Sequence, residues 1–101
     1  MKEIIAKLNK TYENKVRLGI MSVLNGNQSI DFLELKKVLD VTDGNLSSNI
    51  SVLEELGYLE VIKGFVGKKS RTILQVTKEG KQSFQDHLAA LEELILQNKN
   101  K

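Results

Sequence analysis

The spacing of the apolar residues along this chain changes from a helical period to a strand-like period and then back again. Apolar residues at helical spacing predict helices over residues 14–24, 31–39, 43–56 and 78–97. Before the last of these, β-branched and apolar-rich runs on either side of residues 66–70 predict a β-hairpin over residues 58–76. Residues 2–10 add a short helical stripe. We therefore expect a mainly α fold with a small β-hairpin (α+β), in the order α-α-α-β-β-α after a short N-terminal helical extension.

The length and composition favour a single soluble domain over residues 1–101, in which residues 98–101 form a polar tail. No apolar stretch reaches the roughly 18–20 residues that a bilayer-spanning helix needs, and the charged N-terminus has no signal-peptide core. These observations predict a cytoplasmic protein without a membrane partner. The absence of cysteine excludes a disulfide framework, a thiolate metal site and a thiol nucleophile.

The positive charge of the chain is concentrated in one segment. Residues 61–81 hold six basic residues and one acidic residue, whereas the rest of the chain holds nine basic and twelve acidic residues. The segment therefore carries a net charge of +5 within a chain whose total is +2. This asymmetry favours an anionic partner at one face of the molecule. The alternative is a solvated hairpin whose lysines bind nothing.

Two short predicted helices are separated only by Asp40 and Val41, and the basic hairpin follows them. The run VTDGNLSSNI at residues 41–50, continued by LEELGYLEV at residues 53–61, resembles the winged-helix DNA-binding domain of small MarR/ArsR-type transcriptional regulators. The segments KSRT and VTKEG further along are similar to the wing and the following helix start of the same group. The resemblance covers about residues 14–95. It implies a winged helix-turn-helix fold and double-stranded DNA as the partner.

The predicted helix 43–56 has the pattern of a recognition helix, which hides one face and offers the other to the major groove. Its hidden face carries Leu46, Ile50 and Leu53. The candidates for DNA contact are short and polar: Thr42, Asn45, Ser47, Ser48 and Asn49. Amides and hydroxyls contact phosphates or base edges, and asparagine matches adenine well. The alternative is a polar surface that only solvates the helix. Asp43 repels phosphate, and it either complements the helix N-terminus or accepts from a cytosine amino group.

The predicted hairpin supplies a second group of candidates for DNA contact. Lys68, Lys69 and Arg71 surround Gly67 at the turn, which suits contact with phosphates or with the minor groove. Lys63, Lys78 and Lys81 fit a solvated surface as well as they fit DNA contact.

No residue pattern in the chain predicts an enzyme. His87 is the one histidine, so a histidine pair for a metal is absent, and we expect it to face solvent or an interface. No glycine-rich phosphate loop is present. We expect no cofactor and no metal, and no sequence feature supports a small-molecule effector.

Residues 1–12 and 78–97 carry more apolar side chains than a small core can cover, which predicts a homodimer. The candidates for the interface are Ile4, Ile5, Leu8, Leu88, Leu91 and Ile95. Pairing of such termini across a two-fold axis is what the resemblance implies. The alternative is that the first segment packs on the last helix of its own chain.

Together these observations predict a DNA-binding transcriptional regulator that reads an inverted repeat as a homodimer through a recognition helix and a basic wing. A repressor is favoured over an activator, because no activation segment is recognisable. The alternative function is a winged-helix module that docks a protein partner. The basic hairpin discriminates between the two, because a protein-docking wing has no need of such concentrated positive charge.

Overall fold

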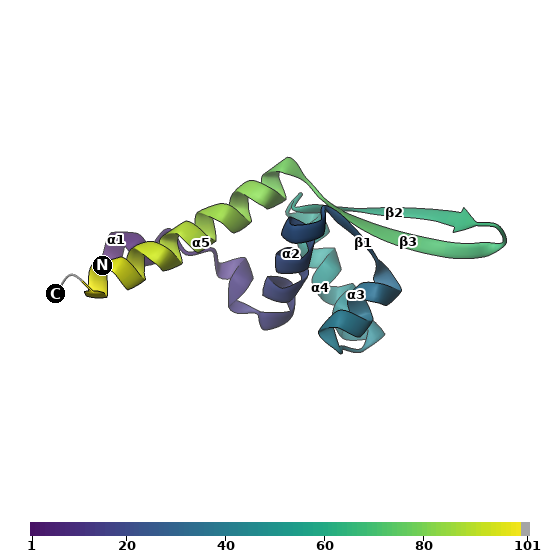
Figure 1. Cartoon of the computed structure of the whole chain (residues 1–101), viewed down its shortest axis with the longest axis horizontal. Helices are drawn as coiled ribbons and strands as arrows, with labels where there is room; N and C mark the ends of the chain where they lie inside the picture. Colours follow the sequence, from purple (N-terminus) through teal and green to yellow (C-terminus); the bar gives the residue numbers. More distant parts are fainter. Residues whose placement is uncertain (100–101) are drawn as a thin grey trace.

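The predicted order of elements is present in the structure, a computed structural model that describes residues 1–99. Its helices are α1 (Lys2–Ile5), the 3-10 helix η1 (Lys10–Glu13), α2 (Lys15–Asn27), α3 (Phe32–Leu39), α4 (Asp43–Glu55) and α5 (Lys78–Lys99). Its strands are β1 (Ser29–Asp31), β2 (Leu59–Val66) and β3 (Lys69–Val76). Figure 1 shows α2, α3 and α4 grouped at the centre, with the β2–β3 hairpin projecting from one end and α5 from the other. None of the described helices is long and apolar enough to span a lipid bilayer.

Side-chain caps explain where the longer helices begin. Asn14, Asp31, Thr42 and Thr77 each accept hydrogen bonds from main-chain amides in the first turn of α2, α3, α4 and α5 respectively. Each cap satisfies amide groups that have no partner within the helix. The sequence-based starts of these helices are therefore confirmed to within one or two residues.

A third strand, β1, was not predicted from the sequence. The sheet has the order β1-β3-β2 with antiparallel pairs, and Ile30 of β1 lies opposite Leu74 of β3. Three residues are too few to show a strand-like alternation, so this strand forms because β3 offers it a free edge. The hairpin turn is also tighter than predicted, since Val66 pairs with Lys69 and leaves only Gly67 and Lys68 between the strands. Gly67 adopts a φ of 64°, which glycine tolerates without strain.

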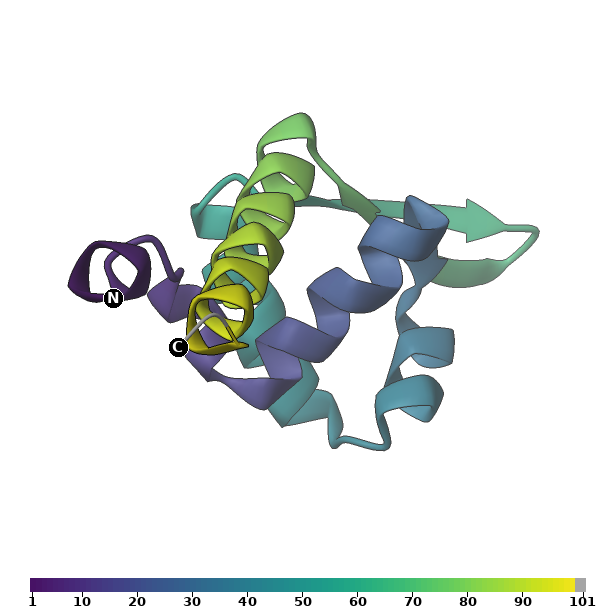
Figure 2. The same cartoon turned by 60° about the vertical axis from the view of Figure 1, so that its left-hand side comes forward.

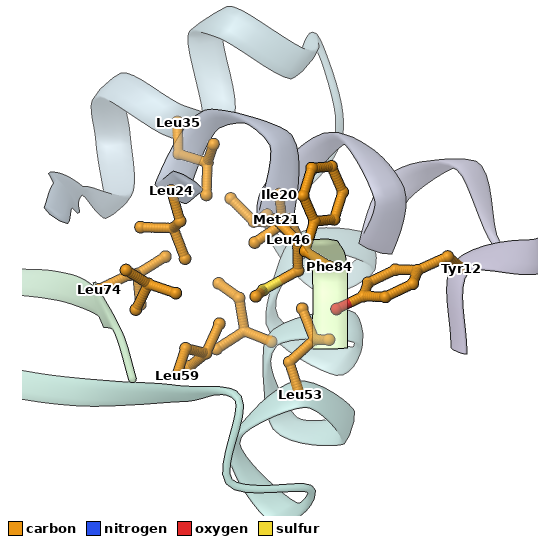
Figure 3. Close-up of a cluster of buried hydrophobic side chains, with 12 residues drawn as sticks. Tyr12, Ile20, Met21, Leu24, Leu35, Leu46, Leu53, Leu59, Leu74 and Phe84 are labelled. Atoms are coloured by element: carbon orange, nitrogen blue, oxygen red, sulfur yellow. The ribbon is translucent and has the colours of Figure 1, made fainter. Parts of the chain in front are cut away.

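The core lies between the three central helices and the inner face of the sheet. Side chains from α2, α3, α4 and both long strands converge there (Figure 3). The most completely buried residues are Ile20, Met21, Leu24, Leu35, Leu46, Leu53, Leu59 and Leu74. Complete burial of each such side chain contributes about 1.5–3 kcal/mol relative to exposure. This core fixes how α4 is held against α2 and the sheet.

The N-terminal extension is less helical than predicted. The predicted helix over residues 2–10 is replaced by the single turn of α1, followed by a turn and by η1. Tyr12 of η1 is buried and packs edge-on against Phe84 of α5, with ring centroids 5.5 Å apart. Its hydroxyl is also hydrogen-bonded to Ser83 at 2.7 Å. Aromatic packing and this bond tie the segment to α5, and Figure 2 shows α1 beside the outer half of that helix.

Helix α5 leaves the sheet at a point of unusually close approach. A Cβ atom on Gly80 would collide with the main-chain carbonyl oxygen of Tyr58. Only glycine allows α5 to begin this close to the end of α4. Further along, α5 buries Phe84, His87 and Ala90, whereas Leu88 is exposed.

Candidate nucleic-acid interface

The inner and outer faces of α4 are largely those predicted from the sequence. Leu46, Ile50 and Leu53 are buried, which confirms the hidden face. Four of the five predicted polar candidates are exposed: Thr42, Asn45, Ser47 and Ser48. These residues lie in the N-terminal half of the helix, which is the part that a recognition helix presents to base edges. The hydroxyl of Thr42 is occupied as the cap and accepts from the main-chain amide of Asn45 at 3.1 Å.

The prediction that Asn49 faces solvent is wrong. This residue is only 6% exposed, because it lies next to the buried Ile50 and faces α2. Its Oδ1 accepts a hydrogen bond from Nη1 of Arg17 at 3.0 Å. Its Nδ2 donates to Oδ1 of Asn45 at 2.7 Å and to the main-chain oxygen of Asn45 at 2.9 Å. Asn49 therefore lies on the buried side of α4 and contacts Asn45, which belongs to the exposed polar face of the same helix.

Arg17 is a site residue that the sequence pattern did not single out. It precedes the buried Ile20 and Met21 by three and four residues, which places it on the same side of α2. Its Nε donates to the main-chain oxygen of Thr11 at 2.9 Å, so the guanidinium links the N-terminal segment to α4. A charged residue on an otherwise apolar helical stripe was the available signal.

Asp43 is paired within the chain, which the sequence did not indicate. Its Oδ1 lies 2.7 Å from Nζ of Lys36 in α3. Asp43 also stands in the first turn of α4, where a carboxylate is favourable next to the helix N-terminus. The lysine offsets the negative charge that would otherwise oppose a phosphate at this end of the helix.

The wing, defined here as β2, β3 and their turn, carries exposed cations and exposed apolar groups. Lys68 and Lys69 are exposed at the tip, as expected. Phe65 and Val66 are also exposed there, at 76% and 60%. Lysine side chains at the end of a projecting hairpin can reach phosphates that the body of the domain does not approach.

Arg71 differs from the other wing cations because it already has a partner. Its Nε donates to Oδ2 of Asp31 at 2.9 Å. This hydrogen bond is the main reason that the pKa of Asp31 is lowered from its ordinary value. Half of the Arg71 side chain remains exposed, so its remaining donors are available at the surface.

A groove between α4 and the sheet joins the two candidate surfaces. Ser47, Ser51 and Glu54 line it from α4, and Lys63 and Thr72 line it from the wing. Phe32, Ile50, Val61 and Leu74 also line this groove. The polar face of α4 and the base of the wing therefore form the two walls of one groove, with apolar side chains between them.

The predicted dimer residues divide into two groups. Ile5, Leu88, Leu91 and Ile95 are exposed at 54%, 45%, 38% and 57%. Ile4 is instead buried, at 6% exposed, because α1 packs on α5 of the same chain. Leu8 is half-buried. The expectation that Ile4 lies at a dimer surface is therefore corrected in favour of packing within the chain.

His87 was expected to face solvent or an interface, and the structure instead buries it within the chain. It is 7% exposed and its Nδ1 accepts a hydrogen bond from the main-chain amide of Asn9 at 3.0 Å. Burial lowers the pKa of His87. Within residues 1–99 no three histidine, aspartate or glutamate side chains lie close enough together to hold a metal ion. His87 thus serves to fasten the N-terminal segment to α5.

Residues 16–95 match the family described as the winged helix DNA-binding domain. The chain belongs to this family. The match spans both α4 and the wing, and it confirms the winged helix-turn-helix that the sequence predicted. It also makes residues 16–95 a DNA-binding domain.

Relatives of this winged-helix domain include proteins of similar length. The uncharacterized protein MJ0432 of Methanocaldococcus jannaschii is 33% identical over 79 residues, which cover 78% of this chain and 86% of that protein. The solved structure of a transcriptional regulator homologue from Pyrococcus horikoshii OT3 is 36% identical, with a TM-score of 0.82 and coverage of 93% and 91%. YusO from Bacillus subtilis is 17% identical with a TM-score of 0.73, covering 96% of this chain and 71% of its own, and it shows the shared fold alone.

Proposed function

We propose that the protein is a cytoplasmic transcriptional regulator that binds an inverted repeat in double-stranded DNA as a homodimer and acts as a repressor. The observation that carries the proposal is that the exposed polar residues in the N-terminal half of α4 and the basic wing lie on either side of one groove. The similarity to the transcriptional regulator homologue from Pyrococcus horikoshii supports the same function.

Each of these two regions suits a different part of the duplex. The exposed Asn45, Ser47 and Ser48 are short enough for α4 to enter the major groove, where base edges are read. Lys68 and Lys69 at the tip of the wing suit the neighbouring phosphates. In this arrangement α4 supplies sequence preference, and the wing supplies affinity that is independent of sequence.

The dimer is proposed from the exposed apolar side chains of α5 and α1. Leu88, Leu91 and Ile95 recur along one face of α5, with Ile5 of α1 as a further exposed apolar side chain. A second copy of the same face would cover them, and two-fold symmetry would present two α4 helices about 34 Å apart, one turn of DNA. A dimer bound in this way can repress by occupying a promoter, which needs no further part.

Selection of bound duplexes from a random DNA library tests this function. We expect one enriched palindrome whose half-sites are centred about one helical turn apart. The double variant Lys68→Ala/Lys69→Ala serves as a control that should bind more weakly and enrich the same palindrome, because phosphates carry no sequence information. If the wild-type protein enriches no DNA, the alternative of a protein-docking module takes its place.

A further inference from the structure

Three side chains form a chain of hydrogen bonds that ends at the DNA-facing side of α4. We call Arg17, Asn49 and Asn45 the amide relay. Arg17 donates to Asn49 at 3.0 Å, and Asn49 donates to Oδ1 of Asn45 at 2.7 Å. Asn45 is exposed, whereas Asn49 is 6% exposed. The relay therefore connects the buried Asn49 to Asn45, a residue at the candidate interface.

The chemistry of arginine sets the direction of every bond in the relay. A guanidinium has donors and no acceptor, so Asn49 must turn its oxygen toward Arg17. The NH2 group of Asn49 then faces Asn45, which must present its own oxygen to receive it. Rotation of either amide by 180° would place two donors, or two acceptors, against each other. The NH2 group of Asn45 is consequently the end that faces outward.

The relay is held at its inner end as well. Nε of Arg17 donates to the main-chain oxygen of Thr11 at 2.9 Å, which fixes the plane of the guanidinium. Nδ2 of Asn49 makes a second bond to the main-chain oxygen of Asn45 at 2.9 Å. Among the described residues, Nδ2 of Asn45 has no hydrogen-bond acceptor. A fixed, outward-facing donor on a recognition helix is suited to an acceptor on the DNA.

We propose that Asn45 reads an acceptor edge in the major groove as a hydrogen-bond donor, with Arg17 and Asn49 as positioning residues. Guanine offers two adjacent acceptors there, O6 and N7, and thymine offers O4. Adenine offers a single acceptor, N7, beside the donor at N6, and cytosine offers only a donor. The bidentate match to adenine needs the amide oxygen and nitrogen to face the base together, and here the oxygen is turned inward. The base expected opposite Asn45 is therefore guanine, whereas the residue type alone would suggest adenine. This inference rests on the proposed function.

The variant Asn49→Asp tests the proposal because it should reverse the polarity of the relay. The carboxylate can accept from Arg17 and from Asn45 but can donate to neither. Asn45 should then turn its NH2 group inward and present its oxygen to the base. We expect the preferred base at one position of each half-site to change from guanine or thymine to cytosine or adenine, whose edges carry donors.

The measurement is selection from a random duplex library, followed by competition between two duplexes that differ only at that position. Discrimination between the two should be about tenfold and should change sign between wild type and Asn49→Asp. The added negative charge weakens binding to both duplexes alike, so it cancels in the ratio. Asn45→Ala should lose the preference at this position and keep it elsewhere. Circular dichroism and thermal unfolding check that the variants remain folded.

A second measurement uses the wild-type protein and therefore does not depend on how a variant folds. Replacing the selected guanine by 7-deazaguanine removes N7, and replacing it by 2-aminopurine removes O6. We expect at least one replacement to weaken binding severalfold. The proposal is overturned if wild type selects adenine at this position, if Asn49→Asp keeps the wild-type preference, or if Asn45→Ala weakens all sequences equally as a phosphate contact would. Failure of the wild type to enrich any DNA would instead overturn the proposed function.

Discussion

Arg71 of β3 and Asp31 of β1 are joined by a hydrogen-bonded ion pair, with Nε of the arginine 2.9 Å from Oδ2 of the carboxylate. The pair ties the base of the wing to the edge of the sheet. Asp31 also caps α3, because its Oδ1 accepts from the main-chain amide of Leu33 at 2.8 Å. One carboxylate thus links the wing to the first helix of the helix-turn-helix.

The two roles of Asp31 can be separated by two substitutions. Asp31→Asn keeps an oxygen for the cap and loses the charge, so it should lower the free energy of unfolding by less than about 1 kcal/mol. Asp31→Ala loses the cap as well and should lower it by about 1–2 kcal/mol more. Urea unfolding at pH 7 measures both. Because the pKa of Asp31 is lowered in the folded state, the stability it supplies is present above about pH 4 and disappears as the pH falls through the folded pKa. The difference between wild type and Asp31→Asn should vanish in acid, and a constant difference would contradict this account.

The salt dependence of DNA binding should depend on the tip of the wing. If Lys68 and Lys69 contact phosphates in both protomers, Lys68→Ala/Lys69→Ala removes about four contacts per dimer. The slope of log affinity against log salt should then flatten by roughly 3–4 units, since each contact contributes about 0.9. Lys2→Ala/Lys7→Ala removes the same charge at the opposite end of the molecule and should leave the slope nearly unchanged. DNA-binding titrations at several salt concentrations compare the two double variants with each other. Equal slopes of log affinity against log salt for both would mean that the wing does not touch DNA.

The two faces of α4 should respond differently to truncation. Leu46→Ala should lower the free energy of unfolding by about 2–5 kcal/mol, through lost burial and the cavity left behind. Ser48→Ala, on the exposed face, should change it by no more than about 0.5 kcal/mol. Asn49→Ala should fall between them, at about 1–3 kcal/mol, because Arg17 would lose its acceptor. Chemical unfolding measures the free energy of unfolding for each variant. If Asn49→Ala left this free energy unchanged, the result would contradict a stabilising contact between Asn49 and Arg17.

Self-association should depend on the exposed apolar face of α5. Leu91→Lys places a charge in the proposed interface, where it would be buried without a partner, so the dimer should dissociate. Gln82→Lys adds the same charge to the same helix at an exposed polar position away from this face and should remain dimeric. Sedimentation at about 10 µM, well above the dissociation constant of a stable dimer, distinguishes them. A monomeric wild type at this concentration would remove the basis for an inverted-repeat operator.

The N-terminal segment should loosen in mild acid. His87 accepts a hydrogen bond through Nδ1 and burial lowers its pKa, so the folded state favours the neutral imidazole. Stability from this group is therefore complete above about pH 6.5 and declines as the pH falls from there to the folded pKa. His87→Gln keeps an acceptor that does not titrate and should show a weaker decline. Thermal unfolding between pH 7.5 and 5 compares the two proteins, and identical profiles would count against this role.

The elements that follow from local patterns were predictable from the sequence. The apolar stripe of Leu46, Ile50 and Leu53 and the cap at Thr42 both depend on spacing within one helix, so α4 was placed correctly. The burial of Asn49 depends on its hydrogen bond with Arg17, which lies 32 positions away in the chain. The two residues meet only after α2 and α4 pack together. Spacing along one helix cannot reveal such a partner.

Contacts between distant segments also explain the other two differences from the sequence-based expectations, the burial of His87 and the presence of strand β1. His87 is polar and its burial depends on the main-chain amide of Asn9, 78 positions away. Strand β1 exists because Ile30 finds Leu74 across the sheet, and its three residues carry no alternation of their own. Local periodicity thus predicted the helices and the hairpin, while polar contacts between distant segments required the three-dimensional structure.

The close approach of Gly80 to the Tyr58 carbonyl sets the direction in which the long helix α5 leaves the domain. Helix α5 has 22 residues and is therefore about 33 Å long, so a tilt of about 10° at its first turn moves the far end by about 6 Å. A side chain at Gly80 would meet the Tyr58 carbonyl and force such a tilt. In a dimer joined through α5, that movement would exceed the rise of a base pair. The separation of the half-sites would then be set by the absence of a side chain at Gly80, at a point that need not touch DNA.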